Sequence, residues 1–373
     1  MDSNQSFQFD FLESDSFTEE TKMSMCLELI QNGIDVNLRN ENSFTPLHFS
    51  VRQGLIEISK LLIENGANVN AENAKGRTPL HCAAIRNFTE LTRILLKHGA
   101  SIEAWAKANC THGHEMVTPI HMSCLKGHFE VTKLLLQSGA NIKGKGILGR
   151  SVLHFAVFGK NLEVIKMLLK HGANIEATAN HGDTPLFIAA TLGDKNITNT
   201  LVENGANVNA QAGNGTPLHQ AVYHNHTEVA EFLIANGANI EATTQDLCTP
   251  LHTALKNCSK NACELLISKG AKINAKNSNG ITPLLLSICA EDQRVDTIEM
   301  LISNGAQVNE KASHFRITPI YMAIAKRRYD IVNILIKNGA SLTVKCAKGE
   351  TPLESALRYK IHGMSKSLIY ERS

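Results

Sequence analysis

The stretch Thr78-Pro79-Leu80-His81-Cys82-Ala83 is one copy of a motif that recurs along almost the whole chain of 373 residues. The copies begin at Thr45, Thr78, Thr118, Ser151, Thr184, Thr216, Thr249, Thr282, Thr318 and Thr351. They are 32 to 40 residues apart, and all nine prolines of the chain lie in this motif. A repeat of this length predicts a stack of similar units instead of one globular core.

Each copy of the motif predicts two short helices. Threonine can accept a hydrogen bond as an N-cap, and proline suits the first helical position, where its missing N–H costs nothing. An apolar pair such as Leu95-Leu96 marks the core side of a second helix, and Gly99 suits a left-handed C-terminal cap. The residue five positions after each motif start is small, which predicts a close contact between helices. These residues are Ser50, Ala83, Ser123, Ala156, Ala189, Ala221, Ala254, Ser287, Ala323 and Ala356.

Thr-Pro-Leu-His-x-Ala at a period of 33 residues resembles the ankyrin repeat. The segment Glu64-Asn65-Gly66-Ala67-Asn68-Val69-Asn70-Ala71, at the end of a second helix, is also similar to that family. The resemblance implies an all-α repeat solenoid of stacked helix-turn-helix units with β-hairpin-like connectors. It covers about ten tandem repeats and a terminal capping helix. This family is defined by a scaffold that binds diverse partners, so the fold alone does not identify the partner.

The domain organisation follows from the repeats and from the charge distribution. We expect the solenoid over residues 18–373, with capping units at 18–37 and 351–373. Residues 1–17 are predicted to be an acidic, flexible tail, because residues 1–21 hold six acidic residues and no lysine or arginine. Residues 311–373 hold 12 basic and 4 acidic residues. This asymmetry is consistent with steering of a partner or with ordinary solvated ends.

Catalysis and nucleic-acid binding are not expected from this sequence. Six of the 16 histidines occupy the same motif position, and repetition at one position indicates a scaffold role, whereas an active site needs an asymmetric constellation. In the ankyrin family this histidine links adjacent connectors. There is no glycine-rich phosphate loop, no G-x-S-x-G motif and no nucleic-acid recognition motif, and the net charge is only +2. We therefore predict a protein that is not an enzyme and needs no cofactor.

The cysteines and the hydropathy pattern bear on the compartment. The nine cysteines are an odd number scattered over separate repeats, so no disulfide framework is visible and a reducing compartment is favoured. The N-terminus is too polar for a secretory signal, and no apolar run approaches 18 residues. We expect a monomeric cytoplasmic or nuclear protein without membrane insertion.

One connector carries a seven-residue insertion at about residues 104–117. It contains Trp105, the only tryptophan, together with Cys110, His112, His114 and Glu115. Zinc sites draw paired ligands from two separated turns, which this single segment does not offer. We therefore predict no metal site, and we interpret the insertion as a protruding loop in which Trp105 contacts a partner.

A partner-binding surface is predicted at the exposed ends of the first helices, seven and eight positions after each motif start. In the family these ends and the connector tips line a concave face. The seventh positions give a strip of apolar and aromatic residues, namely Ile85, Leu125, Phe158, Leu192 and Tyr223. The eighth positions supply Arg86, Lys126 and His224 beside it. Such a strip marks a binding site unless the side chains fold back onto their own helix pair.

Three asparagines resemble sites of asparaginyl hydroxylation in ankyrin repeats. Asn70, Asn209 and Asn274 each follow a leucine eight residues earlier and a valine or isoleucine directly before. The alternative is a structural role in which the side chain ties the turn of its own connector.

For function, we predict a non-catalytic interaction module or scaffold that binds a protein partner through the concave face. Two alternatives remain open at this point. A substrate-recognition subunit of a ubiquitin-ligase-type assembly normally carries a recruiting box, and none is apparent after Arg358. An effector or toxin-like protein built from the same repeats would need specialised export.

Overall fold

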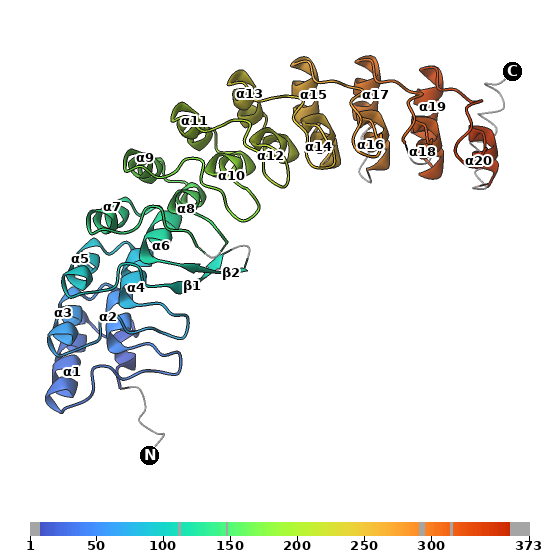
Figure 1. Cartoon of the computed structure of the whole chain (residues 1–373). Helices are drawn as coiled ribbons and strands as arrows, with labels where there is room; N and C mark the ends of the chain where they lie inside the picture. The colour runs from blue at the N-terminus through green and yellow to red at the C-terminus, as the bar shows by residue number, and fades with distance from the viewer. Residues whose placement is uncertain (1–7, 111–112, 147, 291–294, 314–315, 359–373) are drawn as a thin grey trace. The chain divides into compact units, whose positions relative to one another are not determined.

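The computed structural model describes residues 8–110, 113–146, 148–290, 295–313 and 316–358. Within these ranges the chain is a succession of helix pairs with one two-stranded hairpin (Figure 1). The first helices are α2 (Pro46–Gln53), α4 (Pro79–Arg86), α6 (Pro119–Leu125), α8 (Val152–Gly159), α10 (Pro185–Leu192), α12 (Pro217–Tyr223), α14 (Pro250–Lys256), α16 (Pro283–Cys289), α18 (Pro319–Ala325) and α20 (Pro352–Arg358). The second helices are α3 (Ile56–Glu64), α5 (Thr89–Lys97), α7 (Phe129–Gln137), α9 (Leu162–Lys170), α11 (Lys195–Glu203), α13 (Thr227–Ala235), α15 (Lys260–Ser268), α17 (Val295–Ser303) and α19 (Tyr329–Lys337).

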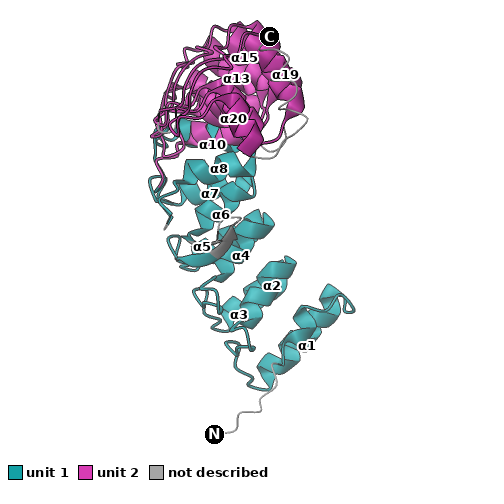
Figure 2. Cartoon of the chain, turned by 90° about the vertical axis from the view of Figure 1, so that its right-hand side faces the viewer, with its two compact units in different colours: residues 1–180 teal, residues 181–373 magenta. Residues whose placement is uncertain are grey.

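The helix pairs group into two compact units, Met1–Asn180 and His181–Ser373, coloured separately in Figure 2. In unit 1 the first helices α2, α4, α6 and α8 pack in succession, and α3, α5, α7 and α9 do the same in a second layer. In unit 2 the first helices from α10 to α20 follow the same order. Each unit is thus an all-α repeat solenoid, as the sequence predicts.

The motif residues begin each first helix as expected. The Thr45 N–H donates to Nδ1 of His48 at 3.2 Å, and the His48 N–H donates to Thr45 Oγ1 at 3.4 Å. Nε2 of the same histidine lies 2.8 Å from the carbonyl oxygen of Arg77 in the next connector. A carbonyl only accepts, so the imidazole carries its proton on Nε2. The histidine therefore caps its own helix and joins two neighbouring repeats.

The predicted close contact at the fifth position is confirmed. Ala83, Ala189 and Ser50 are completely buried. Ser50 and Ser123 each accept a buried hydrogen bond from the second helix, as in the 2.9 Å bond from Ser59 Oγ to Ser50 Oγ. Ser287 instead donates to the carbonyl oxygen of Leu284 in its own helix at 2.8 Å. A bulkier side chain at this position would have to displace the neighbouring helix.

The glycine caps are also confirmed, and the reason is the backbone. Gly66 has φ +88°, and its neighbour Ala67 donates its N–H to the carbonyl oxygen of Leu62 at 2.9 Å. A Cβ atom at Gly66 would meet no other atom within 4 Å. Conformational strain, not lack of space, therefore favours glycine here.

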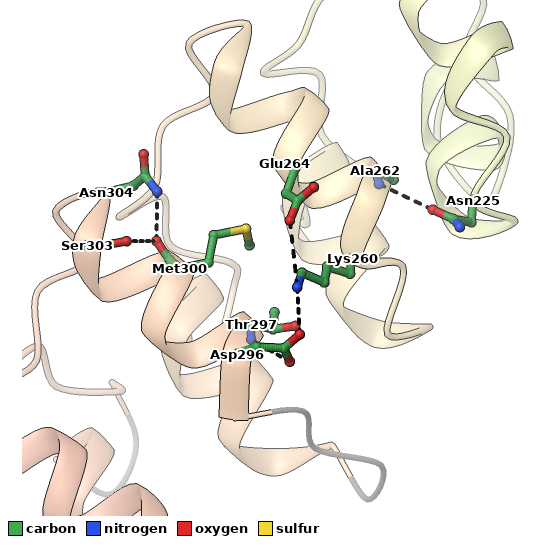
Figure 3. Close-up of polar contacts among 9 residues, drawn as sticks. All are labelled: Asn225, Lys260, Ala262, Glu264, Asp296, Thr297, Met300, Ser303 and Asn304. Atoms are coloured by element: carbon green, nitrogen blue, oxygen red, sulfur yellow. Dashed lines mark hydrogen bonds and ion pairs between the residues drawn. The ribbon is translucent and has the colours of Figure 1, made fainter.

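Polar side chains join neighbouring repeats on the outer layer of unit 2, as Figure 3 shows. Lys260 Nζ on α15 lies 2.6 Å from Asp296 Oδ2 on α17 and 3.9 Å from Glu264 Oε1. Asn225, in the turn before α13, accepts the Ala262 N–H at 3.2 Å. The ion pairs of Lys260, which lie at the surface, contribute at most about 1 kcal/mol each. The buried helix contacts therefore dominate the stability of the stack.

A flexible tail was expected over residues 1–17; residues 1–7 lie outside the described residues, and the part from residue 9 to residue 12 packs against the first repeat. The short 3₁₀ helix η1 (Asp10–Leu12) packs on α2, and Phe9 and Leu12 are completely buried. The Lys22 ammonium group on α1 (Glu19–Gln31) donates to the carbonyl oxygen of Leu12 at 3.2 Å. Residues 9–12 therefore close the apolar end of the first repeat, because an unpaired terminal unit exposes its core. Residues 359–373, within the predicted C-terminal cap, lie outside the described residues.

The insertion before α6, predicted as a protruding loop, forms a two-stranded hairpin. Strands β1 (Ala106–Cys110) and β2 (Gly113–Val117) pair antiparallel, with Ala106 opposite Val117. The Lys107 N–H also donates to the carbonyl oxygen of Lys75 in the preceding connector at 2.8 Å. The hairpin thus extends one connector and is attached to its neighbour.

Candidate partner-binding surface

The ends of the first helices in unit 1 carry the predicted residues in a partly exposed state. Ile85, Leu125 and Phe158 are half-buried, and Arg86 and Lys126 are exposed. The Arg150 guanidinium lies 5.1 Å from the centre of the Phe158 ring, so this ring is partly covered within its own unit. Leu125 and Ile85 are not fully folded back onto their helices, and they remain available at the surface.

The corresponding helix ends of unit 2 have a different character. Leu192 is half-buried, whereas Tyr223 and His224 are exposed. The rings of Tyr223 and His224 lie 5.0 Å apart in an edge-on arrangement. The two halves of the predicted strip therefore lie on separate units.

Hydrogen bonds from the next repeat hold these helix ends in place. Nε2 of His128 donates to the carbonyl oxygen of Ile85 at 2.9 Å, and Asn257 Nδ2 donates to that of Tyr223 at 2.7 Å. His226 similarly bonds the carbonyl oxygen of Thr191 at 3.1 Å. A partner would thus meet a preorganised surface, which lowers the entropic cost of binding.

In unit 1 the helix ends and connectors line a partly open cavity of about 640 Å³, which we call the cationic cavity. Three of the predicted partner-binding residues, Ile85, Arg86 and Lys126, line it. The remaining lining residues are Asn42, Phe44, Arg52, Asn73, Ala74, Lys75, Arg77, Cys82 and His128. None of the connector residues among them was predicted, because the predicted contacts were the helix-end residues and Trp105.

The cationic cavity is strongly positive. Its lining contains three arginines and two lysines and no acidic residue. Glu13 forms an ion pair with Arg52 at 3.0 Å, and the Arg52 guanidinium also lies 5.2 Å from the centre of the Phe44 ring. Burial raises the pKa of the Cys82 thiol to about 11, although the nearby arginines oppose this shift. The thiol therefore stays neutral and adds no negative charge at pH 7.

Two buried donors at the cationic cavity have no hydrogen-bond partner within the described part of the chain: Asn73 Nδ2 and Arg77 Nε. Asn73 is only 5% exposed, and its Oδ1 accepts the N–H groups of Lys75 and Arg77. The amide group is therefore oriented by its oxygen, and its N–H₂ end is left unsatisfied. Unsatisfied buried donors are rare in folded proteins and point to an absent acceptor.

Unit 2 has a cavity in the corresponding place, which we call the polar cavity. Its volume is about 470 Å³, and its charged lining residues are Asp246 and Lys256. The other lining residues are Gly213, Asn214, Gln220, Tyr223, Thr244, Gln245 and Thr253. It therefore lacks the excess positive charge of unit 1.

Trp105 lies directly before β1 and is 42% exposed. Its ring centre is 6.4 Å from that of His121, and it is not among the residues that line the cationic cavity. His112 lies outside the described residues, and the side chains of Cys110, His114 and Glu115 are not described either. Among the residues that are described, no group of three or more potential metal ligands comes together.

The three asparagines predicted as hydroxylation sites have a clear structural role. Asn70 Nδ2 donates to the carbonyl oxygen of Gly99 at 3.0 Å, and Asn70 Oδ1 accepts the Ser101 N–H at 2.7 Å. Asn209 and Asn274 make the equivalent pair of bonds. The side chain therefore bridges to the next repeat, whereas the turn itself is tied by Asn68 through a 2.9 Å bond to the Asn70 N–H. Hydroxylation of these residues stays a prediction.

The repeated histidine is a structural group. His81, His219 and His252 each bond the carbonyl oxygen of the following connector through Nε2, as His48 does. Burial lowers the pKa of His81 and His219 to about 4. A neutral, fully buried imidazole that bonds to the backbone is not available for proton transfer to a substrate.

Helix pairs at a regular period, joined by histidine and asparagine bridges between neighbours, define a helical-repeat solenoid. Comparison with protein families agrees, because the model for ankyrin repeats in three copies matches residues 18–106, 104–179, 177–244, 241–312 and 286–372. The chain belongs to the ankyrin-repeat family, whose members are typically non-enzymatic protein-interaction modules. Comparison with curated proteins gave no match. In the part of the chain that the structure describes, no helix is long and apolar enough to cross a membrane.

Proposed function

We propose that this protein binds a partner protein through the surface formed by the ends of its first helices and the adjoining connectors. The observation that carries the proposal is the half-burial of Ile85 and Leu125 at helix ends that are fixed by bonds such as His128 to the Ile85 carbonyl oxygen. A rigid, partly apolar surface ringed by Arg86 and Lys126 has the features of a binding hot spot. The protein supplies no chemistry of its own in this proposal.

The same proposal extends to the other predicted contact residues. Phe158 continues the surface in unit 1, and Trp105 offers an exposed aromatic contact directly before the hairpin. In unit 2, Leu192, Tyr223 and His224 form a second patch at the helix ends. We expect a monomer that works in a reducing compartment, cytoplasmic or nuclear. Support for the reducing compartment comes from the free thiols of the cysteines among the described residues.

The test begins with affinity capture of the partner and identification by mass spectrometry, followed by calorimetric titration. Ile85→Ala with Leu125→Ala is expected to lower the affinity by at least about 2 kcal/mol, because apolar contacts at the centre of an interface dominate binding. The melting temperature should change little, since both side chains are only half-buried. Tyr223→Ala tests the patch of unit 2 separately.

The matched control is Lys170→Ala, an exposed residue on the second helix α9. The proposal is refuted if the variant with Ile85→Ala and Leu125→Ala keeps its affinity while Lys170→Ala loses binding. That result would place recognition on the layer of second helices. Loss of binding only with Trp105→Ala would place recognition at the insertion instead.

A further inference from the structure

We propose that the cationic cavity binds the carboxylate groups of an acidic segment of the partner protein. This proposal rests on the proposed function and adds the chemistry of the partner. It concerns unit 1 alone, where the cavity, its charges and its unsatisfied donors are all formed by the repeats that begin at Thr45, Thr78 and Thr118.

The charge of the cavity is not balanced within the described residues. Arg52 is paired with Glu13, but Lys75, Arg86 and Lys126 have no ion-pair partner in the described part of the chain. Positive charges that converge on a cavity raise the local concentration of anionic ligands and speed their association. The expected ligand is therefore an anion.

The unsatisfied donors indicate what kind of atom is missing. Asn73 Nδ2 and Arg77 Nε can only donate, so the absent partner must be an acceptor. The unsatisfied state of Asn73 follows from the sequence of the preceding repeat. The equivalent amide of Asn277 donates to the Cys248 sulfur at 3.8 Å, whereas Phe44 stands at the position of Cys248 and offers no acceptor. Oxygens of a bound carboxylate would satisfy both donors.

Apolar residues in the same cavity favour a peptide over a simple ion. The Phe44 ring and the Ile85 side chain line the cavity together with the cations. An inorganic anion would leave both exposed to water, but a peptide with an apolar side chain beside its acidic residues would cover them. Leu125, directly before Lys126, extends this apolar contact along the next helix end.

The spacing of the cations indicates several carboxylates instead of one compact anion. Arg86 and Lys126, two of the cations without an ion-pair partner among the described residues, come from the ends of two successive first helices. Packed helices are about 8–10 Å apart, and an extended peptide advances about 3.3 Å per residue. The cations therefore match acidic residues about three positions apart in an extended segment. A single phosphate group would reach only one part of this row.

The test uses a randomised peptide display library selected on the full chain. We expect the selected peptides to be enriched in Asp and Glu at a spacing of about three residues, with an apolar residue between them. A synthetic selected peptide should bind at least about ten-fold more weakly to Arg77→Gln with Arg86→Gln, as expected for loss of close charged contacts. Changing the acidic residues of the peptide to Gln or Asn should weaken binding similarly.

Two further variants keep the result interpretable. Arg86→Gln alone changes an exposed residue, so a loss of affinity cannot be attributed to misfolding. Arg93→Gln is the matched control, because Arg93 is an exposed arginine of the same unit on the second helix α5, where it pairs with Glu90 at 3.5 Å. This control should leave peptide binding unchanged.

Selected peptides without acidic enrichment would overturn the inference, as would equal affinity for the Arg77 and Arg86 variant. Binding that appears only after phosphorylation of the peptide would replace the carboxylate by a phosphate and also overturn it. Neutral peptides that lose affinity with Ile85→Ala and Leu125→Ala would refute this inference but leave the proposed function intact. Peptides that bind equally well to the Arg77 and Arg86 variant and to the Ile85 and Leu125 variant would refute the proposed function as well.

Discussion

The cationic cavity of unit 1 and the polar cavity of unit 2 are formed by the same parts of the repeat but differ in chemistry. Three positions before the motif threonine, unit 1 has Lys75 and unit 2 has Asp246. Directly before the threonine, Arg77 corresponds to Cys248. The buried motif residues are alike in both places, so the scaffold is independent of these changes. The chemical difference between the two surfaces therefore comes from the connector residues.

The two units also differ in how many buried histidines they contain. Every motif of unit 1 has histidine at the third position after its start, whereas unit 2 has Phe187, Leu285, Tyr321 and Glu354 at four of six such positions. Burial lowers the pKa of His48, His81 and His121 in unit 1 to about 4, and in unit 2 a shift of that size is found at His219. This difference leads to the largest expected effect.

We predict that acid destabilises unit 1 more than unit 2. The folded pKa of each such histidine lies below its unfolded value of 6.5, so its stabilising contribution is complete above pH 6.5 and is lost as the pH falls toward 4. Each such histidine lowers the free energy of unfolding by about 3 kcal/mol over this pH range. Hydrogen exchange at pH 7 and pH 5, corrected for intrinsic rates, should show the larger loss of protection in α2 to α8. An equal loss in both units would contradict this prediction.

A smaller effect is expected from exchanging the charges of the two cavities. Lys75→Asp should weaken binding of a selected acidic peptide by about 1 kcal/mol, because Lys75 is an exposed charge at the edge of the cationic cavity. Asp246→Lys should not create an acidic-peptide site in unit 2, since Thr244 and Cys248 do not provide the donors of Asn73 and Arg77. Fluorescence anisotropy with the labelled peptide measures both. A new site in Asp246→Lys would show that charge alone defines recognition.

The sequence predicted the scaffold because each of its determinants is local. Thr45 and His48 cap one helix, Ala83 marks one contact, and Gly66 ends one helix, so a single repeat contains the information. The docking of Phe9 was missed, since it depends on the exposed core of the first repeat and has no periodic signal. The insertion after Trp105 was predicted as a protruding loop, without its strand pairing.

The candidate site was predicted only in part, for a related reason. Arg86 and Lys126 followed from their position at helix ends, and they do line the cationic cavity. The unsatisfied amide of Asn73 could not be predicted, because it depends on Phe44 in the preceding repeat. Alignment of the connectors would have revealed Lys75 and Arg77 beside these residues. The part of the site that could not be predicted depends on contacts between repeats, which the pattern within one repeat does not reveal.

The central claim is that the partner lies against the first-helix ends and connectors, and footprinting of the complex tests it most directly. Hydroxyl-radical labelling of the captured complex, compared with the free protein, should show protection of Ile85, Leu125 and Phe158. The second helices α5, α7 and α9 should remain equally reactive in both states. Protection confined to those second helices, with Ile85 and Leu125 unchanged, would contradict the account.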